Sequence, residues 1–300
     1  MLAVDLRTGP SANLVLAGSV LVDTGSGSPA SIARMRTFLA EHDASPQWVA
    51  LTHFHADHAG GAAALGVPIA AHAIEASLVN ASDPRAGDPW LGFSIPPYRV
   101  TRALRAGDQV GPLVVVHTPG QTPGHVAYWH EASRTAITGD LLQHGDVAWV
   151  PFGGPWAEGA LDTMIASVQR IAALDPVRVI PGHGPPVEDV PQAVAETLER
   201  YERFRAEPAK AVWHAVRRAL VSHLMIEPRS ARALAALPWA PVAAAALSSE
   251  PLLVVDQALS GLAERGVVIR DGSAWATTLP HEERANCAGK GGGQPAARQR

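Results

Sequence analysis

Residues 51–61 read LTHFHADHAGG, and this stretch decides the fold. Three histidines and one aspartate occupy positions 53–58, between an apolar run and two glycines. The apolar run predicts a strand over residues 48–53, with His53 and His55 pointing the same way because side chains alternate along a strand. Asp57 and His58 then lie on the turn into a helix that runs through Leu65. Because one Zn²⁺ takes about four ligands, these four candidates serve either one metal or two.

Three more candidate ligands follow apolar runs or Pro-Gly turns further along the chain. They are His125 in TPGH, Asp140 in ITGD and His183 in IPGHG. Turns of this kind bring the backbone in close at a strand end. Any one of these histidines alone is more commonly a surface or hydrogen-bonded structural residue. The repeated pattern instead favours a shared metal site.

With these motifs the sequence resembles the metallo-β-lactamase superfamily. His53, His55, Asp57 and His58 match its HxHxDH motif, and His125, Asp140 and His183 match the remaining ligand positions in order. The resemblance covers roughly residues 12–185. It implies an α+β fold, a four-layer αββα sandwich with metals at the strand ends.

The resemblance also implies a role for each ligand. His53, His55 and His125 would hold a first metal, Asp57, His58 and His183 a second, and Asp140 would bridge both. Two Zn²⁺ per chain are expected, and Fe or Mn would also suit imidazole with a carboxylate bridge. Asp23 in VLVDTG matches a loop that supports the site from behind, where a carboxylate orients a ligating imidazole. His117 is assigned a structural role.

The net charge expected at the metal site suits a hydrolase. Two Zn²⁺, the carboxylates of Asp57 and Asp140 and a bridging hydroxide leave a net charge of about +1, which suits an anionic transition state. Metal binding also lowers the pKa of water from ~15.7 toward ~7. We therefore expect a dinuclear metal-dependent hydrolase of thioesters, esters or lactones. Asp57 and Asp140 would be its catalytic carboxylates, and Asp57 would relay a proton.

Single sequence features argue for or against the other activities found in the superfamily. True β-lactamases usually carry cysteine or serine where Asp140 stands, which argues against antibiotic hydrolysis. A phosphodiesterase or ribonuclease remains the alternative. A DNA-binding regulator is the third hypothesis, from the C-terminal region described below.

Two loops rich in aromatic residues and proline are the candidate substrate walls. Their aromatic residues are Trp90, Phe93, Tyr98, Trp149, Phe152 and Trp156. Trp149 and Phe152 follow Asp140 closely and are preferred as the walls of an apolar cleft for an acyl group. Tyr98 is a candidate donor to an oxyanion, and His144 a candidate contact with substrate. Core packing is the alternative for each aromatic residue.

The chain divides near Gly184-Pro185-Pro186. Before it, strand patterns alternate with helices at 28–42 and 159–174, which favours mixed sheets covered by helices. After it, helices at 190–207, 208–224 and 252–266 precede a hairpin over 266–278. We predict a catalytic domain over residues 1–188, a helical, winged-helix-like domain over 189–280 and a disordered tail over 281–300.

Composition narrows the choice of partners. The ten Lys and Arg between residues 196 and 271 are nearly balanced by nine acidic residues, which argues against nucleic-acid binding. The substrate is expected to be a small acyl compound, and a homodimer is left open. The single cysteine, Cys287, fits a reducing compartment. The N-terminus lacks a signal-peptide pattern, and the longest apolar stretch, 233–249, is broken by two prolines. A cytoplasmic protein without a membrane span is expected.

Overall fold

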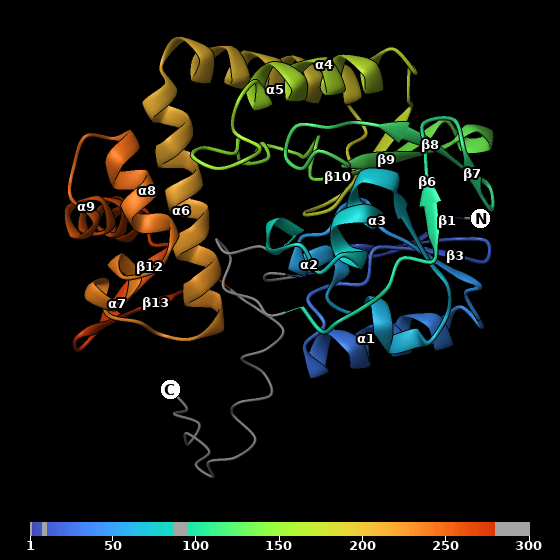
Figure 1. Ribbon diagram of the computed structural model, residues 1–300, viewed down its shortest axis with the longest axis horizontal. Helices are drawn as coiled ribbons and strands as arrows, with labels where there is room; N and C mark the ends of the chain where they lie inside the picture. Colours follow the sequence, from blue (N-terminus) through green and yellow to red (C-terminus); the bar gives the residue numbers. More distant parts are fainter. Residues whose placement is uncertain (1, 8–10, 87–94, 280–300) are drawn as a thin grey trace, which may run out of the picture.

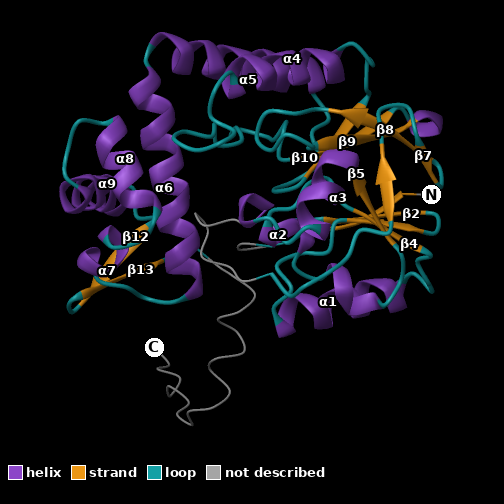
Figure 2. Ribbon diagram, viewed as in Figure 1, coloured by secondary structure: helices purple, strands orange, loops and turns teal. Residues whose placement is uncertain are grey.

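The computed structural model describes residues 2–7, 11–86 and 95–279. Trp90, Phe93, Cys287 and the tail expected over 281–300 lie outside these residues. The described part contains two large β-sheets, a small hairpin and helices on both sides of the sheets (Figures 1 and 2).

The first sheet has six strands in the order β1-β2-β3-β4-β5-β6. The strands are Leu2–Asp5, Leu14–Ala17, Val20–Val22, Trp48–Ala50, Ile69–His72 and Arg102–Leu104. The pairs from β1 to β3 are antiparallel, and those from β3 to β6 are parallel. The carboxyl ends of β3, β4 and β5 therefore meet at one edge of the sheet.

The second sheet has five strands in the order β11-β10-β9-β8-β7. In chain order the strands β7 to β11 are Gln109–Val110, Leu113–His117, Val126–His130, Thr135–Gly139 and Arg178–Pro181. Only β10 and β11 pair in parallel, so the loops after these two strands also leave the sheet at one edge.

The helices and sheets form four layers. Helix α1 (Pro29–Glu41) packs Met35, Phe38 and Leu39 against the outer face of the first sheet. Side chains of both sheets fill the space between them, and Tyr128 is fully buried there. Helices α4 (Ala160–Ala172) and α5 (Val190–Ala206) cover the outer face of the second sheet. The layering follows the expected helix-sheet-sheet-helix order (Figure 2).

Short helices fill the first sheet's outer layer beside α1. They are α2 (Ala56–Ala59), the 3₁₀ turn η1 (Ala62–Leu65) and α3 (Ala73–Asn80), followed by a 3₁₀ turn at Pro84–Ala86. In the second sheet a 3₁₀ turn, Glu131–Ser133, connects β9 and β10. Helix α2 and η1 replace the single helix expected through Leu65. Helix α1 begins as expected, since Ser28 accepts a hydrogen bond from the backbone N–H of Ser31 at 3.1 Å.

The strand expected over 48–53 is shorter than predicted. Strand β4 ends at Ala50, and His55 is already the N-cap residue of α2. The alternation of side chains along a strand therefore does not explain why His53 and His55 face the same space, since neither residue is in a strand. The turn between β4 and α2 positions them instead.

The C-terminal region is helical and ends in a hairpin. It contains α6 (Pro208–Ile226), α7 (Ala231–Ala235), α8 (Trp239–Ala246), α9 (Pro251–Glu264), β12 (Val268–Asp271) and β13 (Ala274–Thr277). Pro208 occupies the first turn of α6, as expected. Gly272 and Ser273 form the two-residue loop of the hairpin, since Asp271 still pairs with Ala274. The winged-helix assignment stays a prediction.

The two regions have separate cores that meet on α6. Ala211 belongs to the core that also holds α4 and α5, whereas Val212 belongs to the core of the C-terminal region. Packing thus groups α5 with the layers of the two large sheets, while the proposed division at residue 188 stays a prediction. Among the described residues no single helix is long and apolar enough to cross a membrane. Helices α8 and α9 reach that length only together, and they are bent by 89°.

Candidate metal centre

All seven predicted ligands lie where loops leave the two sheets. His53, His55, Asp57 and His58 come from the turn after β4 and from α2. The other three are His125 before β9, Asp140 after β10 and His183 after β11. Six of the seven are buried, and His183 is partly exposed, with a side-chain exposure of 21%. Residues distant in sequence thus share one buried site.

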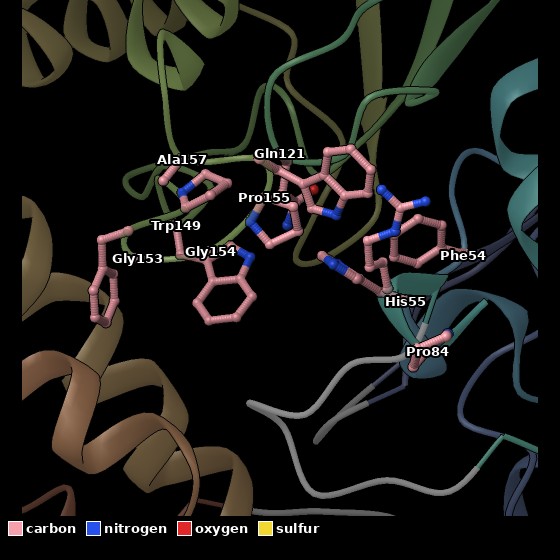
Figure 3. A pocket seen from close by; sticks show the side chains of 13 residues that line it. Phe54, His55, Pro84, Gln121, Trp149, Gly153, Gly154, Pro155 and Ala157 are labelled. Carbon is pink, nitrogen blue, oxygen red and sulfur yellow. The ribbon is translucent and has the colours of Figure 1, made fainter.

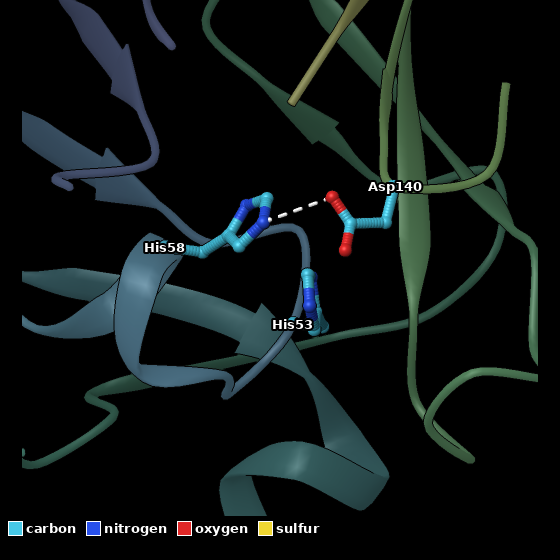
Figure 4. A group of neighbouring side chains, drawn as sticks. All are labelled: His53, His58 and Asp140. Carbon is cyan, nitrogen blue, oxygen red and sulfur yellow. Dashed lines mark hydrogen bonds and ion pairs between the residues drawn. The ribbon is translucent and has the colours of Figure 1, made fainter. Parts of the chain in front are cut away.

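Two groups of three side chains have their ligand atoms within 4.8 Å of one another. The first is His53, His58 and Asp140 (Figure 4), and the second is Asp57, His58 and His183. In the first, His58 Nε2 is 3.1 Å from Asp140 Oδ1. In the second, His183 Nε2 is 3.1 Å from Asp57 Oδ2. His58 belongs to both groups.

The two groups are also joined through Asp140, because His183 Nε2 is 3.4 Å from its Oδ1. The expected bridging residue therefore contacts members of both groups.

His55 and His125 adjoin His53 without belonging to either group. His53 Nε2 and His55 Nδ1 are 2.9 Å apart, and the ring centroids of His53 and His125 are 5.0 Å apart. The second group matches the expected second set of ligands, whereas the first contains His58 and Asp140 in place of His55 and His125. Which residues hold which ion stays a prediction.

In His53, His58 and His125 the Nδ1 atom contacts an oxygen atom of a neighbouring side chain. Asp23 Oδ2 lies 2.8 Å from His58 Nδ1, and Asp23 also accepts from the backbone and the hydroxyl of Thr52 at 2.8 Å each. Thr52 Oγ1 and Thr118 Oγ1 lie 3.0 and 2.9 Å from Nδ1 of His53 and His125. Asp23 thus has the supporting position expected of it. These contacts leave the Nε2 atoms directed into the site.

Two residues that the sequence did not single out complete the site. Glu75, on α3, is buried and accepts from Phe54 N, Thr122 Oγ1 and Gly124 N at 3.0, 2.6 and 3.0 Å. It therefore ties the turn that carries His53 and His55 to the turn before His125. Gln121 donates from Nε2 to Asp140 Oδ2 at 2.7 Å, which leaves Oδ1 facing the histidines.

Glycine is required at one contact in the site. A Cβ atom on Gly182 would lie 2.6 Å from His58 Cε1 and 2.9 Å from Asp140 Oδ1. The close approach of the turn after β11 therefore depends on the glycine in the IPGHG motif.

Burial and charge set the protonation of the ligands. Burial lowers the pKa of His125 to about 3, and burial together with the His58 and His55 charges holds the pKa of His53 well below its usual value. Both imidazoles are therefore neutral at pH 7. Burial also opposes the charge of His58, but Asp140, Asp57 and Asp23 outweigh it and raise its pKa.

The residues fit a divalent metal ion. Nε2 of His125 and Oδ1 of Asp57 are buried and have no hydrogen-bond partner within the described part of the chain. Unpaired buried polar atoms are costly, and a cation bound there would satisfy both. A donor set of imidazole nitrogens and carboxylate oxygens suits Zn²⁺, Fe or Mn.

The predicted substrate residues separate into two classes. Trp149 and Phe152 line an apolar pocket of about 210 Å³ beside His55, and Trp156 lines the same pocket (Figure 3). His144 is exposed and lines a different hollow, next to Pro185 and Glu188. Tyr98 packs beside Val100 in the core under α3. The structure does not bring His144 or Tyr98 to the ligand cluster. His117 stacks on His72 with centroids 4.1 Å apart, consistent with its structural role.

Comparison with known proteins places these residues in a family. The model of the metallo-beta-lactamase superfamily matches residues 10–183. The lactamase-like protein aptB and the thioesterase pkgB of Emericella nidulans are each 31% identical over 194 and 195 residues. These matches cover 64% of this chain but only 56% and 51% of those proteins, so the chain spans about half their length. The acyl-coenzyme A thioesterase MBLAC2 of Gallus gallus is 27% identical over 194 residues, 55% of this chain and 68% of that protein.

Solved structures extend the likeness beyond the metal centre. The metallo-beta-lactamase family protein TTHA1429 from Thermus thermophilus is 25% identical with a TM-score of 0.57. The match covers 92% of this chain and 98% of that one, so it includes much of the C-terminal helical region. TTHA1623, solved in a di-iron-bound form, is 30% identical with a TM-score of 0.51, over 65% of this chain and 96% of that one. From the matched family model, the ligand cluster and the layered sheets together, the chain belongs to the metallo-β-lactamase superfamily.

Proposed function

We propose that the chain is a dinuclear metal-dependent hydrolase of thioesters, esters or lactones. The main support is that seven candidate ligands from both sheets converge on one buried site, where Asp140 contacts members of both three-residue groups. Because one Zn²⁺ takes about four ligands, a set of seven suits a pair of ions. Within this substrate class, the relatives named as thioesterases favour the thioester.

The identity of the metal is part of the proposal. Zinc suits the donor set first, and the di-iron form of TTHA1623 supports iron as the second candidate. Ions held by His53, His55, Asp57, His58, His125, Asp140 and His183 would supply Lewis acidity and lower the pKa of water.

The reaction on a thioester is a hydrolysis. The oxygen of water bonds to the acyl carbon, the C–S bond breaks and the thiol sulfur leaves with the electron pair of that bond. One proton of water goes to the leaving sulfur, and the carboxylic acid that forms releases the other. The protein must therefore bind the acyl group, hold the carboxylates in place and move a proton.

Asp57 and Gln121 have atoms suited to these tasks. Asp57 Oδ2 lies 3.1 Å from His183 Nε2, and Oδ1 has no hydrogen-bond partner within the described residues. The carboxylate oxygen that does not hold an ion would be able to take a proton from water. Gln121 holds Asp140 through Oδ2 and keeps the other oxygen toward the ligand cluster. The ring of Trp149 lies edge-on to His55, a candidate ligand, with centroids 6.0 Å apart. An acyl group in the pocket that Trp149 lines would therefore lie next to the bond to be cleaved.

Phosphodiester or RNA hydrolysis is the second candidate. The observation that favours it is a larger cavity at the same site, lined partly by arginines such as Arg217. Arginine suits phosphate as well as carboxylate, so both substrate classes need testing.

The first test combines metal analysis with hydrolysis of thioester, ester, lactone, β-lactam and phosphodiester probes on one preparation. We expect about two divalent ions per chain and cleavage of at least one acyl probe. His58→Ala should lower the metal content and reduce the rate by about 10–100-fold, because it removes one of the candidate ligands. His42→Ala, on the exposed end of α1, is the matched control and should retain both. Equal rates for His58→Ala and the native chain would refute the proposal.

A further inference from the structure

A second cavity extends from the ligand cluster to the C-terminal region. It has a volume of about 490 Å³, and its wall near the cluster contains Asp57, Asp140 and His183. Its far wall is formed by α5, α6 and the end of α9. The C-terminal region therefore encloses part of the space in which a substrate would lie.

Four arginines line this cavity, and two of them share an ion pair with one carboxylate. Asp146 pairs with Arg200 at 3.1 Å and with Arg218 at 2.7 Å, and it also contacts His214 at 3.1 Å. The remaining two arginines, Arg217 and Arg265, have no ion pair within the described part of the chain. The cavity thus has an excess of positive charge on the wall away from the carboxylates.

Arg265 lies close enough to Arg217 to affect its charge. Burial and the nearby Arg265 both lower the pKa of Arg217, and no carboxylate of the described residues offsets them. The guanidinium of Arg217 lies over the ring of Trp213, 5.9 Å from its centroid, which fixes its position. Two neighbouring like charges without a counter-ion form a ready site for an anion.

The apolar pocket and this cavity share one wall. His55, Gln121 and Trp149 line both. A substrate with its reacting bond at the ligand cluster can therefore extend one end into each space. The apolar pocket, lined by Phe152 and Trp156, suits an acyl chain (Figure 3).

We propose that the leaving thiol of the substrate carries anionic groups, and that Arg217 and Arg265 bind these groups while the acyl chain enters the apolar pocket. The proposal rests on the proposed thioester hydrolysis. Phosphates and carboxylates share the chemistry that paired guanidinium groups recognise. Coenzyme A represents the phosphate-bearing thiols and glutathione the carboxylate-bearing thiols.

The test compares three octanoyl thioesters with the same acyl group, those of coenzyme A, glutathione and neutral N-acetylcysteamine. The native chain should cleave at least one anionic thioester with a kcat/KM at least about tenfold above that of the neutral one. Arg217→Gln combined with Arg265→Gln should abolish this preference, mainly by raising KM. The rate on the N-acetylcysteamine thioester should stay within about twofold, since charge-assisted contacts are lost only with an anionic thiol.

A binding measurement separates this proposal from the proposed function. Calorimetric titration with coenzyme A and with glutathione reports the anion site without catalysis, and the tighter ligand identifies phosphate or carboxylate. The double variant should weaken that binding at least about tenfold. Arg232→Gln, an exposed substitution on α7, is the matched control and should alter neither binding nor rate. Circular dichroism of each variant verifies folding.

The outcomes are distinct. Cleavage of all three thioesters with equal kcat/KM, unchanged in the double variant, would overturn the anion site and leave the proposed function intact. Arginine-dependent binding of coenzyme A or glutathione without cleavage of any thioester would support the site and refute thioester hydrolysis. Arginine-dependent cleavage of a single-stranded oligonucleotide, with no thioester cleaved, would overturn the assignment of a thiol.

Discussion

Glu75 shows how one buried side chain supports the metal centre at the scale of a residue. Its two oxygens accept from three donors in the two turns that carry His53, His55 and His125. Burial raises its pKa to about 7, although these donors lower it. The folded chain therefore binds the carboxyl proton more tightly than the unfolded chain, where the pKa is 4.5. By linkage, this contribution to stability is complete below pH 4.5 and declines as the pH rises to 7.

Glu75→Gln should destabilise the protein most at low pH. The amide nitrogen of glutamine would face one of the three donors, so we expect a loss of about 1–3 kcal/mol in the free energy of unfolding at about pH 5. The loss should be smaller at about pH 8, where the native carboxyl has lost its contribution. Urea unfolding of metal-free protein at both pH values measures this. Glu41→Gln, exposed at the end of α1, should behave as the native chain. A loss that grows from the lower to the higher pH would contradict the argument.

The residues of the site differ in how far the sequence could predict them. The seven candidate ligands follow short motifs in which glycines, prolines and histidines have fixed spacing, so a local pattern was sufficient to single them out. Glu75 contacts residues 47 and 49 positions away, and no local pattern marks it. Gln121 is similar, because only the fold brings it to Asp140. His144, chosen for its nearness to Asp140 in sequence, is exposed and lines another hollow, next to Pro185 and Glu188.

At the scale of elements, the sequence predicts the long periodic segments better than the short ones. The helix at 28–42 has its serine cap and its apolar stripe, and α1 follows both. Helix α3 is not predicted, since it has eight residues and no cap signal of serine, threonine or aspartate. The strand before the HxHxDH motif is predicted too long, because apolar residues continue past Ala50 into a turn that is buried by tertiary contacts.

Asp146, in a loop after β10, contacts side chains of α5 and α6. Replacing it should therefore lower the stability of the protein. Burial opposes its charge, but the hydrogen bond from His214 and the charge of Arg218 outweigh burial and hold its pKa below the usual value. Its contribution to stability is therefore present above pH ~4 and is lost as the pH falls. Asp146→Asn should lower the free energy of unfolding at about pH 7 by about 0.5–1 kcal/mol, the scale of a partly exposed network.

Urea titrations at two pH values measure this effect of Asp146→Asn. The difference from the native chain should shrink at about pH 3.5, where the native carboxylate begins to lose its contribution. Asp43→Asn, exposed after α1, is the control. A difference that stays undiminished at the lower pH would exclude this role.

At the scale of the whole molecule, metal binding should couple to stability. The ligands come from both sheets, so an ion bound to them joins elements that separate on unfolding. At a free metal concentration about 100 times the Kd, binding adds roughly 2.7 kcal/mol, which raises the Tm by about 4–5 °C for a chain of this size. Calorimetry with and without a chelator measures the shift. It should shrink in His58→Ala, and an equal shift in that variant would place the stabilising ion elsewhere.

Helix α6 has a consequence for engineering by domain exchange. Two consecutive residues, Ala211 and Val212, pack into different cores, and the same helix carries His214, Arg217 and Arg218 on the cavity wall. A chimaera cut anywhere inside α6 would leave apolar surface of one parent facing solvent or an unmatched neighbour. The practical fusion point is therefore before Pro208, because α6 supplies Val212, Val216 and Leu220 to the C-terminal core and only Ala211 to the other core.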